Sequence, residues 1–470
     1  DAWQTASADL ALNEVEGSQT AGLAPFSAEG HIEYVRETGG WMLAASGLSL
    51  DTVDEDWPEA TLQVRPRLTD SGDLQALSAR ASYVNLDDLR YFRSWLGGNT
   101  RTIVDDLALS GRLSDVSFDV SALDTEKPLY DIAADFTDAG MAATDSIPGV
   151  RGLTGRLRAD SSGGRLEIDS TDVTLSLPEQ LAEPIRIDDA VGTVIWRAND
   201  DGTTVLSDSI RVRNAELDSQ SSLQLVLPAD GSAPLLDLES EWSINDISAA
   251  PRYLPQKLIA PGLYRWLSTA LVAGSIPNGR TRLTGPIDQF PFDGGEGTFR
   301  IDADMVNTTL RYSDKWPDAE NMDMHVVVDG ARLYSEKNTA TNAGNSVVDA
   351  KVEIADLRRP VLTIDAFATG SLQSIREMAI RSPIAGVFGG RLAEVNVSGD
   401  ASFELQLELP ILDRLNYDFT TRVQTGGGSL QFDGFRPAIT ELNGVVTVSR
   451  DAIVTESLFG MFLGEPVDIE

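Results

Sequence analysis

The sequence predicts a mainly β protein in which one long antiparallel sheet carries a few short amphipathic helices. Three observations predict this class. Apolar and polar residues alternate over most of the chain, turn-forming residues separate the alternating segments, and only three segments adopt the spacing of a helix. Strands with one apolar and one polar face are typical of antiparallel meanders, because parallel sheets are usually covered on both faces.

The strands can be followed along the chain by their alternation. The clearest segment is 403–409, where four large apolar residues alternate with polar ones. Successive side chains of a strand point to opposite faces, so each apolar set shares one face. In chain order the sets are Val116, Phe118 and Val120; Leu236, Leu238, Ser240, Trp242 and Ile244; Phe299, Ile301, Ala303 and Met305; Leu362, Ile364, Ala366 and Ala368; and Phe403, Leu405, Leu407 and Leu409.

Turn chemistry separates several of these strands. The segments 70–72, 161–164 and 199–202 are rich in Asp, Asn, Ser and Gly, and they predict hairpins. A weak internal repeat of strand, turn and strand begins at Gly155, Gly192 and Gly444. Such a unit cannot close a core alone, so it must bury its apolar face against its neighbours or against something else.

Three segments have helical spacing: 86–96, 261–273 and 372–380. Asn85 precedes the first as a candidate N-cap, Pro261 suits the first turn of the second, and the third ends before Pro383. Amphipathic helices beside a one-sided sheet most often cover it. A lid or a surface for a partner is the alternative role.

Composition excludes several functions. The chain has 37 Lys and Arg residues against 73 Asp and Glu, a net charge of −36, which argues against nucleic acid or a bare anionic membrane as a partner. It has no Cys and two His, so it lacks the ligands of a Cys- or His-rich metal centre. Since no catalytic constellation or cofactor motif is present, we expect a protein that is not an enzyme. The acid excess fits either adaptation to salt or the compositional bias of a GC-rich genome.

Several short motifs are concentrated between residues 252 and 333. They are Arg252-Tyr253-Leu254-Pro255, Pro261-Gly262-Leu263, Trp266-Leu267, Phe290-Pro291-Phe292, Asn307-Thr308-Thr309-Leu310 and Trp316-Pro317. Together they resemble the YhdP family, large AsmA-like envelope proteins of Gram-negative bacteria. The resemblance extends over most of the chain, to Leu442-Asn443-Gly444 near its end.

This resemblance implies a periplasmic bridge segment with a repeating β-groove, along which glycerophospholipids slide by their acyl chains between the inner and outer membranes. It implies a tether to the inner membrane through a segment outside this chain. The most apolar stretch, 263–276, is too short and too polar to be a membrane span. The implied partners are phospholipid acyl chains and, through segments outside this chain, both membranes, with other envelope proteins as further partners.

A strongly twisted antiparallel sheet can curl until its apolar face lines an open apolar groove. We therefore expect β-groove repeats over 1–250 with a helix near 86–96, and a continuation of the same groove over 251–470 with helices near 261–273 and 372–380. The candidate lining residues are Phe403, Leu405, Leu407, Leu409, Leu362, Ile364, Val352, Ile354, Phe299, Ile301, Leu238 and Trp242. The alternative is an extended adhesin or structural spacer with closed β-sandwich cores. The residues alone favour neither, and the resemblance favours the groove.

Overall fold

The computed structural model describes residues 4–15, 26–52, 57–89, 106–123, 125, 128–144, 148–178, 181, 183–254, 259–388, 390–413 and 416–469. Within these ranges 26 strands form one antiparallel sheet, which confirms the predicted mainly β class. The chain divides into two compact units, residues 1–214 with 220–236, and residues 215–219 with 237–470. None of the helices in the described ranges is long and apolar enough to cross a membrane.

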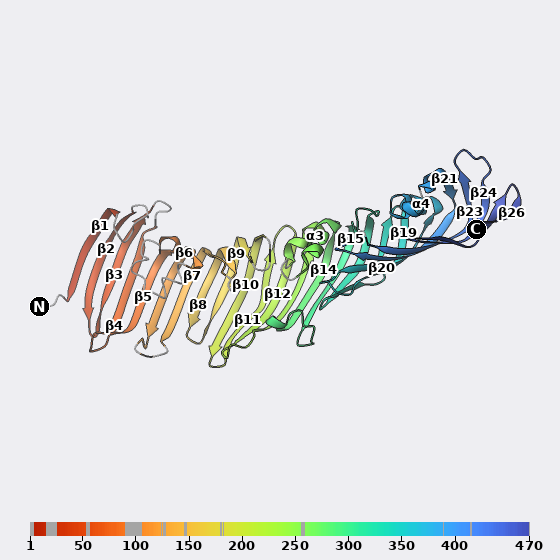
Figure 1. Cartoon of the computed structure of the whole chain (residues 1–470). Helices are drawn as coiled ribbons and strands as arrows, with labels where there is room; N and C mark the ends of the chain where they lie inside the picture. The colour runs from red at the N-terminus through yellow and green to blue at the C-terminus, as the bar shows by residue number, and fades with distance from the viewer. Residues whose placement is uncertain are drawn as a thin grey trace. The chain divides into compact units, whose positions relative to one another are not determined.

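The first unit is a meander in which each strand from β1 to β10 pairs with the next strand along the chain (Figure 1). Its strands are β1 (Thr5–Val15), β2 (Phe26–Glu37), β3 (Gly40–Asp51), β4 (Ala60–Leu68), β5 (Leu74–Asn85), β6 (Ser110–Ser121), β7 (Leu129–Met141), β8 (Gly149–Asp160), β9 (Gly163–Ser176), β10 (Ile185–Asn199) and β11 (Gly202–Arg213). A short 3-10 helix, η1 (Leu86–Asp88), follows β5.

Polar turns connect these strands, as the sequence predicts. Between β10 and β11, Asn199 Oδ1 accepts hydrogen bonds of 3.0 Å from the backbone N–H groups of Asp201 and Gly202. Between β8 and β9, Asp160 Oδ1 accepts a 2.7 Å bond from the backbone of Ser162. Such side-chain bonds stabilise a tight reversal of the chain, so consecutive strands become neighbours in the sheet.

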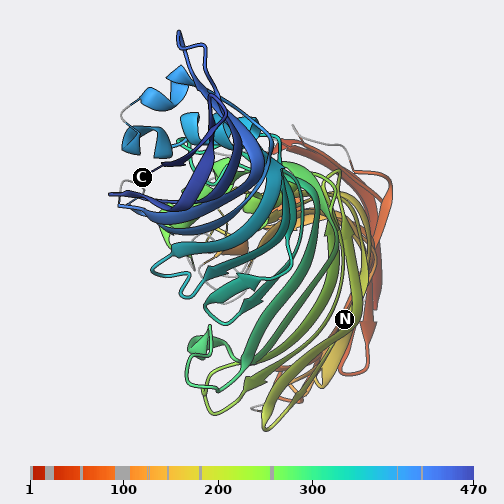
Figure 2. The same ribbon diagram turned by 90° about the vertical axis from the view of Figure 1, so that its right-hand side faces the viewer.

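The strands β12 (Leu217–Pro228) and β13 (Leu235–Ile244) have residues in both units. The further strands of the second unit are β14 (Leu271–Pro286), β15 (Thr298–Leu310), β16 (Ala319–Asp329), β17 (Arg332–Ser335), β18 (Thr339–Asn342), β19 (Asn345–Ile354), β20 (Val361–Ser371), β21 (Val395–Ser398), β22 (Asp400–Pro410), β23 (Asp418–Phe432), β24 (Ile439–Ser449), β25 (Ile453–Phe462) and β26 (Glu465–Ile469). Its helices are η3 (Ile247–Tyr253), α3 (Pro261–Ala270), η4 (Ile287–Gln289), α4 (Leu372–Ile380), α5 (Ile384–Val387) and η5 (Arg391–Glu394). Figure 2 shows the last strands of this unit as strongly curved, with α4 and α5 on the inner side of the curve.

Of the three predicted helices, one has the expected bounds, one is shorter, and one lies mostly outside the described residues. Helix α4 occupies 372–380, the expected range, and the side chains and backbones of Ser371 and Ser374 form a reciprocal capping box at its start. Helix α3 ends at Ala270 instead of reaching 273, because the chain passes directly into β14. Leu271 already pairs with Leu310 of β15. The expected helix at 86–96 begins as η1, and most of it falls outside the described residues.

Candidate apolar groove

A row of residues crosses the first unit, with one member on each strand from β1 to β11. Each member lies directly opposite the next in the antiparallel register, so all of them share one face of the sheet. This central row consists of Ala6, Tyr34, Leu43, Val64, Ala79, Phe118, Ile132, Ala159, Gly164, Trp196 and Val205. Every member is partly exposed, and none belongs to the buried core. The first unit therefore presents a continuous, accessible apolar face.

A second apolar row runs beside the central row. In β7 to β10 it consists of Ala134, Leu157, Leu166 and Val194, which again lie directly opposite one another. Residues two positions apart along a strand are about 7 Å apart. The two rows therefore make a broad apolar strip rather than a single line of side chains.

The opposite face of the same strands is charged. Arg80 pairs with Asp119 and Arg156 pairs with Asp135, each with an N–O distance of 2.6 Å. Hydrogen bonds from these guanidinium groups hold the pKa of Asp119 and of Asp135 below the usual range of an aspartate. Both carboxylates are therefore ionised at neutral pH, and this face stays in contact with water.

Glycines make the floor of the apolar face flat. Gly164 lies opposite Trp196 in the register, and a Cβ at this position would lie 2.2 Å from the Trp196 ring. Gly155 lies opposite Phe136, and a Cβ at this position would meet the backbone carbonyl of Glu167 in β9 as well as the Phe136 ring, 2.9 Å away. Each ring therefore lies across the neighbouring strand in the space that a larger residue would fill.

In the second unit the register brings predicted lining residues of neighbouring strands onto one face. Two of the resulting rows are Leu407, Ile364 and Val352, and Leu409, Leu362 and Ile354. The second row continues to Ile301 through two further strands. Ile354 lies opposite Leu333 of β17, Leu333 lies opposite Val328 of β16, and Val328 lies opposite Ile301 of β15. Alternation in β22 places Phe403 and Leu405 on the same face.

The lining candidates on β13 and β15 lie on this face as well. Phe299 and Ile301 lie opposite Leu283 and Thr281 of β14. The indole N–H of Trp242 donates a 3.0 Å hydrogen bond to Thr281 Oγ1. Leu238 shares the face of Trp242, while Glu239 and Glu241 point the other way and pair with Arg282 and Arg280.

Exposure divides the twelve candidates into two groups. Phe403, Leu405, Leu407, Leu409, Leu362 and Ile354 are buried, with 9% or less of their surface exposed. Ile364, Val352, Phe299, Ile301, Leu238 and Trp242 are partly exposed. The buried group lies within one large cluster that includes residues of α3, α4 and α5.

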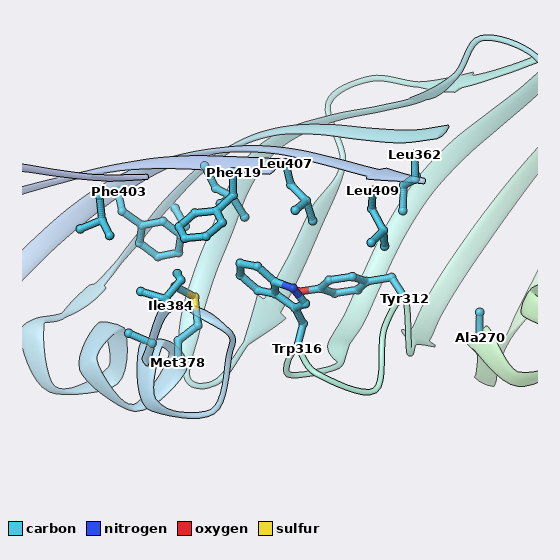
Figure 3. Close-up of a cluster of buried hydrophobic side chains, with 14 of the residues drawn as sticks. Ala270, Tyr312, Trp316, Leu362, Met378, Ile384, Phe403, Leu407, Leu409 and Phe419 are labelled. Atoms are coloured by element: carbon cyan, nitrogen blue, oxygen red, sulfur yellow. The ribbon is translucent and has the colours of Figure 1, made fainter. Parts of the chain in front are cut away.

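Two segments cover the buried group. Figure 3 shows Met378 of α4 and Ile384 of α5 on the side of the sheet face that carries Phe403 and Phe419. The loop that follows β15 contributes Trp316, whose ring meets that of Phe419 edge to face at 5.9 Å between centroids. Trp266 of α3 holds this loop by donating from Nε1 to the carbonyl of Tyr312 at 2.9 Å. In this part of the second unit the apolar face is closed.

The central row is not among the lining residues predicted from the sequence. The strand expected at 116–120 includes Phe118. The row also contains three Ala residues and one Gly, so its alternation of large apolar and polar side chains is weaker than that of 403–409. The row could be predicted by pairing the strands of successive hairpins and asking which apolar residues then share one face.

Among the described residues, no group of three or more His, Asp or Glu side chains is arranged to hold a metal ion.

An antiparallel sheet with a charged face and an apolar face that is accessible in the first unit is the architecture of a β-groove protein. The chain belongs to the YhdP family, because the sequence model of this family, described as "YhdP protein", matches residues 5–470.

A curated relative is the intermembrane phospholipid transporter YhdP of Escherichia coli (strain K12). The two sequences are 21% identical over 464 residues. The match covers 96% of this chain and 36% of the relative, so the chain spans about a third of that protein's length. No solved structure matches the chain.

Proposed function

We propose that this chain is a periplasmic bridge segment that carries glycerophospholipids between the inner and outer membranes of a Gram-negative bacterium. The observation that carries the proposal is the central row, a partly exposed apolar face that continues over eleven strands. The name of the E. coli relative, an intermembrane phospholipid transporter, supports the same substrate class.

The physical basis is the burial of acyl chains. Each methylene removed from water contributes about 0.8 kcal/mol, so a long acyl chain on the apolar strip gains on the order of 10 kcal/mol. The charged headgroup stays in water at the open side. Because each strand offers a similar row position, no position binds much more tightly than its neighbours, and the lipid slides from strand to strand.

The proposal includes the surroundings of the chain. Segments outside this chain tether it to the inner membrane and contact both membranes, and other envelope proteins are further partners. In the second unit we assign the lining to the six partly exposed candidates: Leu238, Trp242, Phe299, Ile301, Val352 and Ile364.

One observation favours the alternative, a structural spacer with closed cores and no lipid. The cluster below α4 and α5 is closed and contains twenty buried residues. A spacer would need such closure throughout. The partial exposure of the central row in the first unit favours lipid transport over this alternative.

The test is site-specific photo-crosslinking in cells. A photoreactive amino acid is placed at Ile132, in the central row, and in a matched variant at Asp131, its exposed neighbour on the opposite face. We expect phospholipid to be captured at 132 and not at 131. Capture at neither position, or equal capture at both, would contradict the proposed function.

A further inference from the structure

We propose that α4 and α5 form a lid that opens to let lipid pass over the last part of the apolar face. This inference rests on the proposed function and concerns the regulation of the same groove. It predicts two states of the second unit: the closed state described here, and an open state in which acyl chains reach β20, β22 and β23.

The lid is part of an insertion between two paired strands of the sheet. Strands β20 and β22 pair directly along their whole length, from Val361 opposite Pro410 to Ser371 opposite Asp400. Helices α4 and α5 belong to an excursion that leaves this hairpin after Ser371 and returns before Asp400. Its last part is β21, which pairs with β23 from Val395 opposite Phe432 to Ser398 opposite Ser429. The two ends meet where the backbone N–H of Leu372 donates a 2.8 Å bond to the carbonyl of Gly399. The part of the excursion that precedes β21 can therefore move while the pairing of β20 with β22 and of β21 with β23 stays intact.

The lid covers an apolar surface of the sheet. Ile375, Met378 and Ile384 of the lid are buried in the same cluster as Phe403 and Leu407. Register places these sheet residues on the face that continues into the partly exposed Ile364 and Val352. The apolar side chains of the lid thus occupy the space that an acyl chain needs (Figure 3). An acyl chain replaces the contacts that the lid gives up, so lipid favours the open state by its own differential affinity.

A polar latch of hydrogen-bonded side chains holds the lid in the closed position. Ser374, in the first turn of α4, donates from its hydroxyl to Asn345 Oδ1 at 2.8 Å. The amide of Asn345 donates to the carbonyl of Asn342 at 3.0 Å, and the amide of Asn342 donates to the carbonyl of Pro317 at 3.0 Å. The latch therefore ties the lid to the turn between β18 and β19 and to the loop that carries Trp316. Because buried polar groups must be paired, these bonds define one closed position.

The experiment locks the lid with a disulfide. An ideal Cβ at Gly344 lies 3.7 Å from Ser374 Cβ, within the range of a disulfide, and the chain has no other Cys. The double variant Gly344→Cys/Ser374→Cys is compared in its oxidised and reduced forms, which differ only in the lock. Each form is incubated with vesicles of phosphatidylethanolamine and phosphatidylglycerol that contain a phospholipid with a diazirine in its acyl chain. Labelled residues are mapped by mass spectrometry after illumination.

We expect labelling of 401–409 in the reduced form and at least a tenfold loss in the oxidised form, while labelling of the central row stays equal. Ser374→Ala removes the latch bond to Asn345, and the capping bond to Ser371 with it, without adding a lock. It should raise the labelling of 401–409 above the wild-type level. This single variant decides the question if the cysteine pair, which places a side chain at the positive φ of Gly344, does not fold.

Two results would overturn the lid. One is equal labelling of 401–409 in the oxidised and reduced forms, and the other is labelling of the central row alone in every variant, which would mean a permanent core. Absence of labelling on the whole apolar face would overturn the proposed function, and the lid with it.

Discussion

At the scale of single residues, glycines decide how aromatic rings lie on the apolar face. The ring of Trp196 fills the space above Gly164, and the ring of Trp242 fills the space above Gly279. A side chain at either glycine would push the ring away from the sheet. The aromatic rings therefore lie flat against the sheet and form part of its apolar surface.

We expect Gly164→Val to lower the free energy of unfolding by about 1 to 3 kcal/mol, because the new side chain overpacks the space taken by the Trp196 ring. Urea unfolding measures the change. Gly386→Ala in α5 is the control, since no atom lies within 4 Å of its Cβ position, and it should not lower the free energy of unfolding. Equal effects of the two substitutions would contradict this packing.

Leu407 tests burial below the lid. Leu407→Asp should lower the free energy of unfolding by about 3 to 5 kcal/mol, because it places an unpaired carboxylate at a position that is only 3% exposed. Glu408→Asp keeps a carboxylate one residue away on the exposed face, and it should change stability by less than about 0.5 kcal/mol. Thermal unfolding of both variants is the measurement. A small effect at Leu407 would mean that water reaches this position in the native state.

At the scale of elements, the sequence predicts strands and faces better than it predicts what covers them. The expected strands at 299–305, 362–368 and 403–409 lie within β15, β20 and β22. Period-2 alternation is a local signal, so one strand suffices to reveal it. The cover cannot be inferred in this way, because Trp316 meets Phe419 across about a hundred residues of chain.

Helix ends show a similar limit. Leu271 continues the apolar stripe of α3 and also begins β14, and the spacing does not tell these roles apart. Gly274, which directly follows the expected helix range 261–273, lies inside β14 with a φ of +121°. Its Cβ position is 2.6 Å from the backbone of Thr308 in β15, so a close approach of strands requires the glycine.

The latch allows a prediction for several elements at once. Asn345 is fully buried and bonds both Asn342 and Ser374. We expect Asn345→Ala to lower the free energy of unfolding by about 1 to 3 kcal/mol, since it leaves a buried carbonyl and a hydroxyl without this partner. Hydrogen exchange of the α4 amides should accelerate at the same time. Asn278→Ala, at an exposed site, is the control, and faster exchange in α4 there as well would argue against a specific latch.

At the scale of the whole molecule, charge is the dominant feature. Acidic residues exceed basic ones by 36, so ion pairs such as Arg80 with Asp119 neutralise only part of the acidic surface. The remaining carboxylates repel one another, and this repulsion favours the unfolded chain, in which charges are farther apart.

If this acidity is an adaptation to salt, the melting temperature should rise as NaCl increases from about 0.01 M to 1 M, because the screening length falls from about 30 Å to 3 Å. Calorimetry at constant pH measures the rise. Choline chloride should reproduce it, since screening depends on ionic strength rather than on the cation. A flat or falling melting temperature would favour genomic bias as the origin of the composition.

Pairing in chain order has a consequence for how the family can vary in length. A hairpin inserted into the meander of the first unit widens the sheet by two strand spacings, about 10 Å. A hairpin adds two strands of opposite direction, so the chain leaves it at the same edge of the sheet at which it entered. The following strands therefore keep their directions and their order. The reach of such a protein is therefore adjustable in fixed increments through duplication or loss of hairpins, while the profile offered to each acyl chain stays the same.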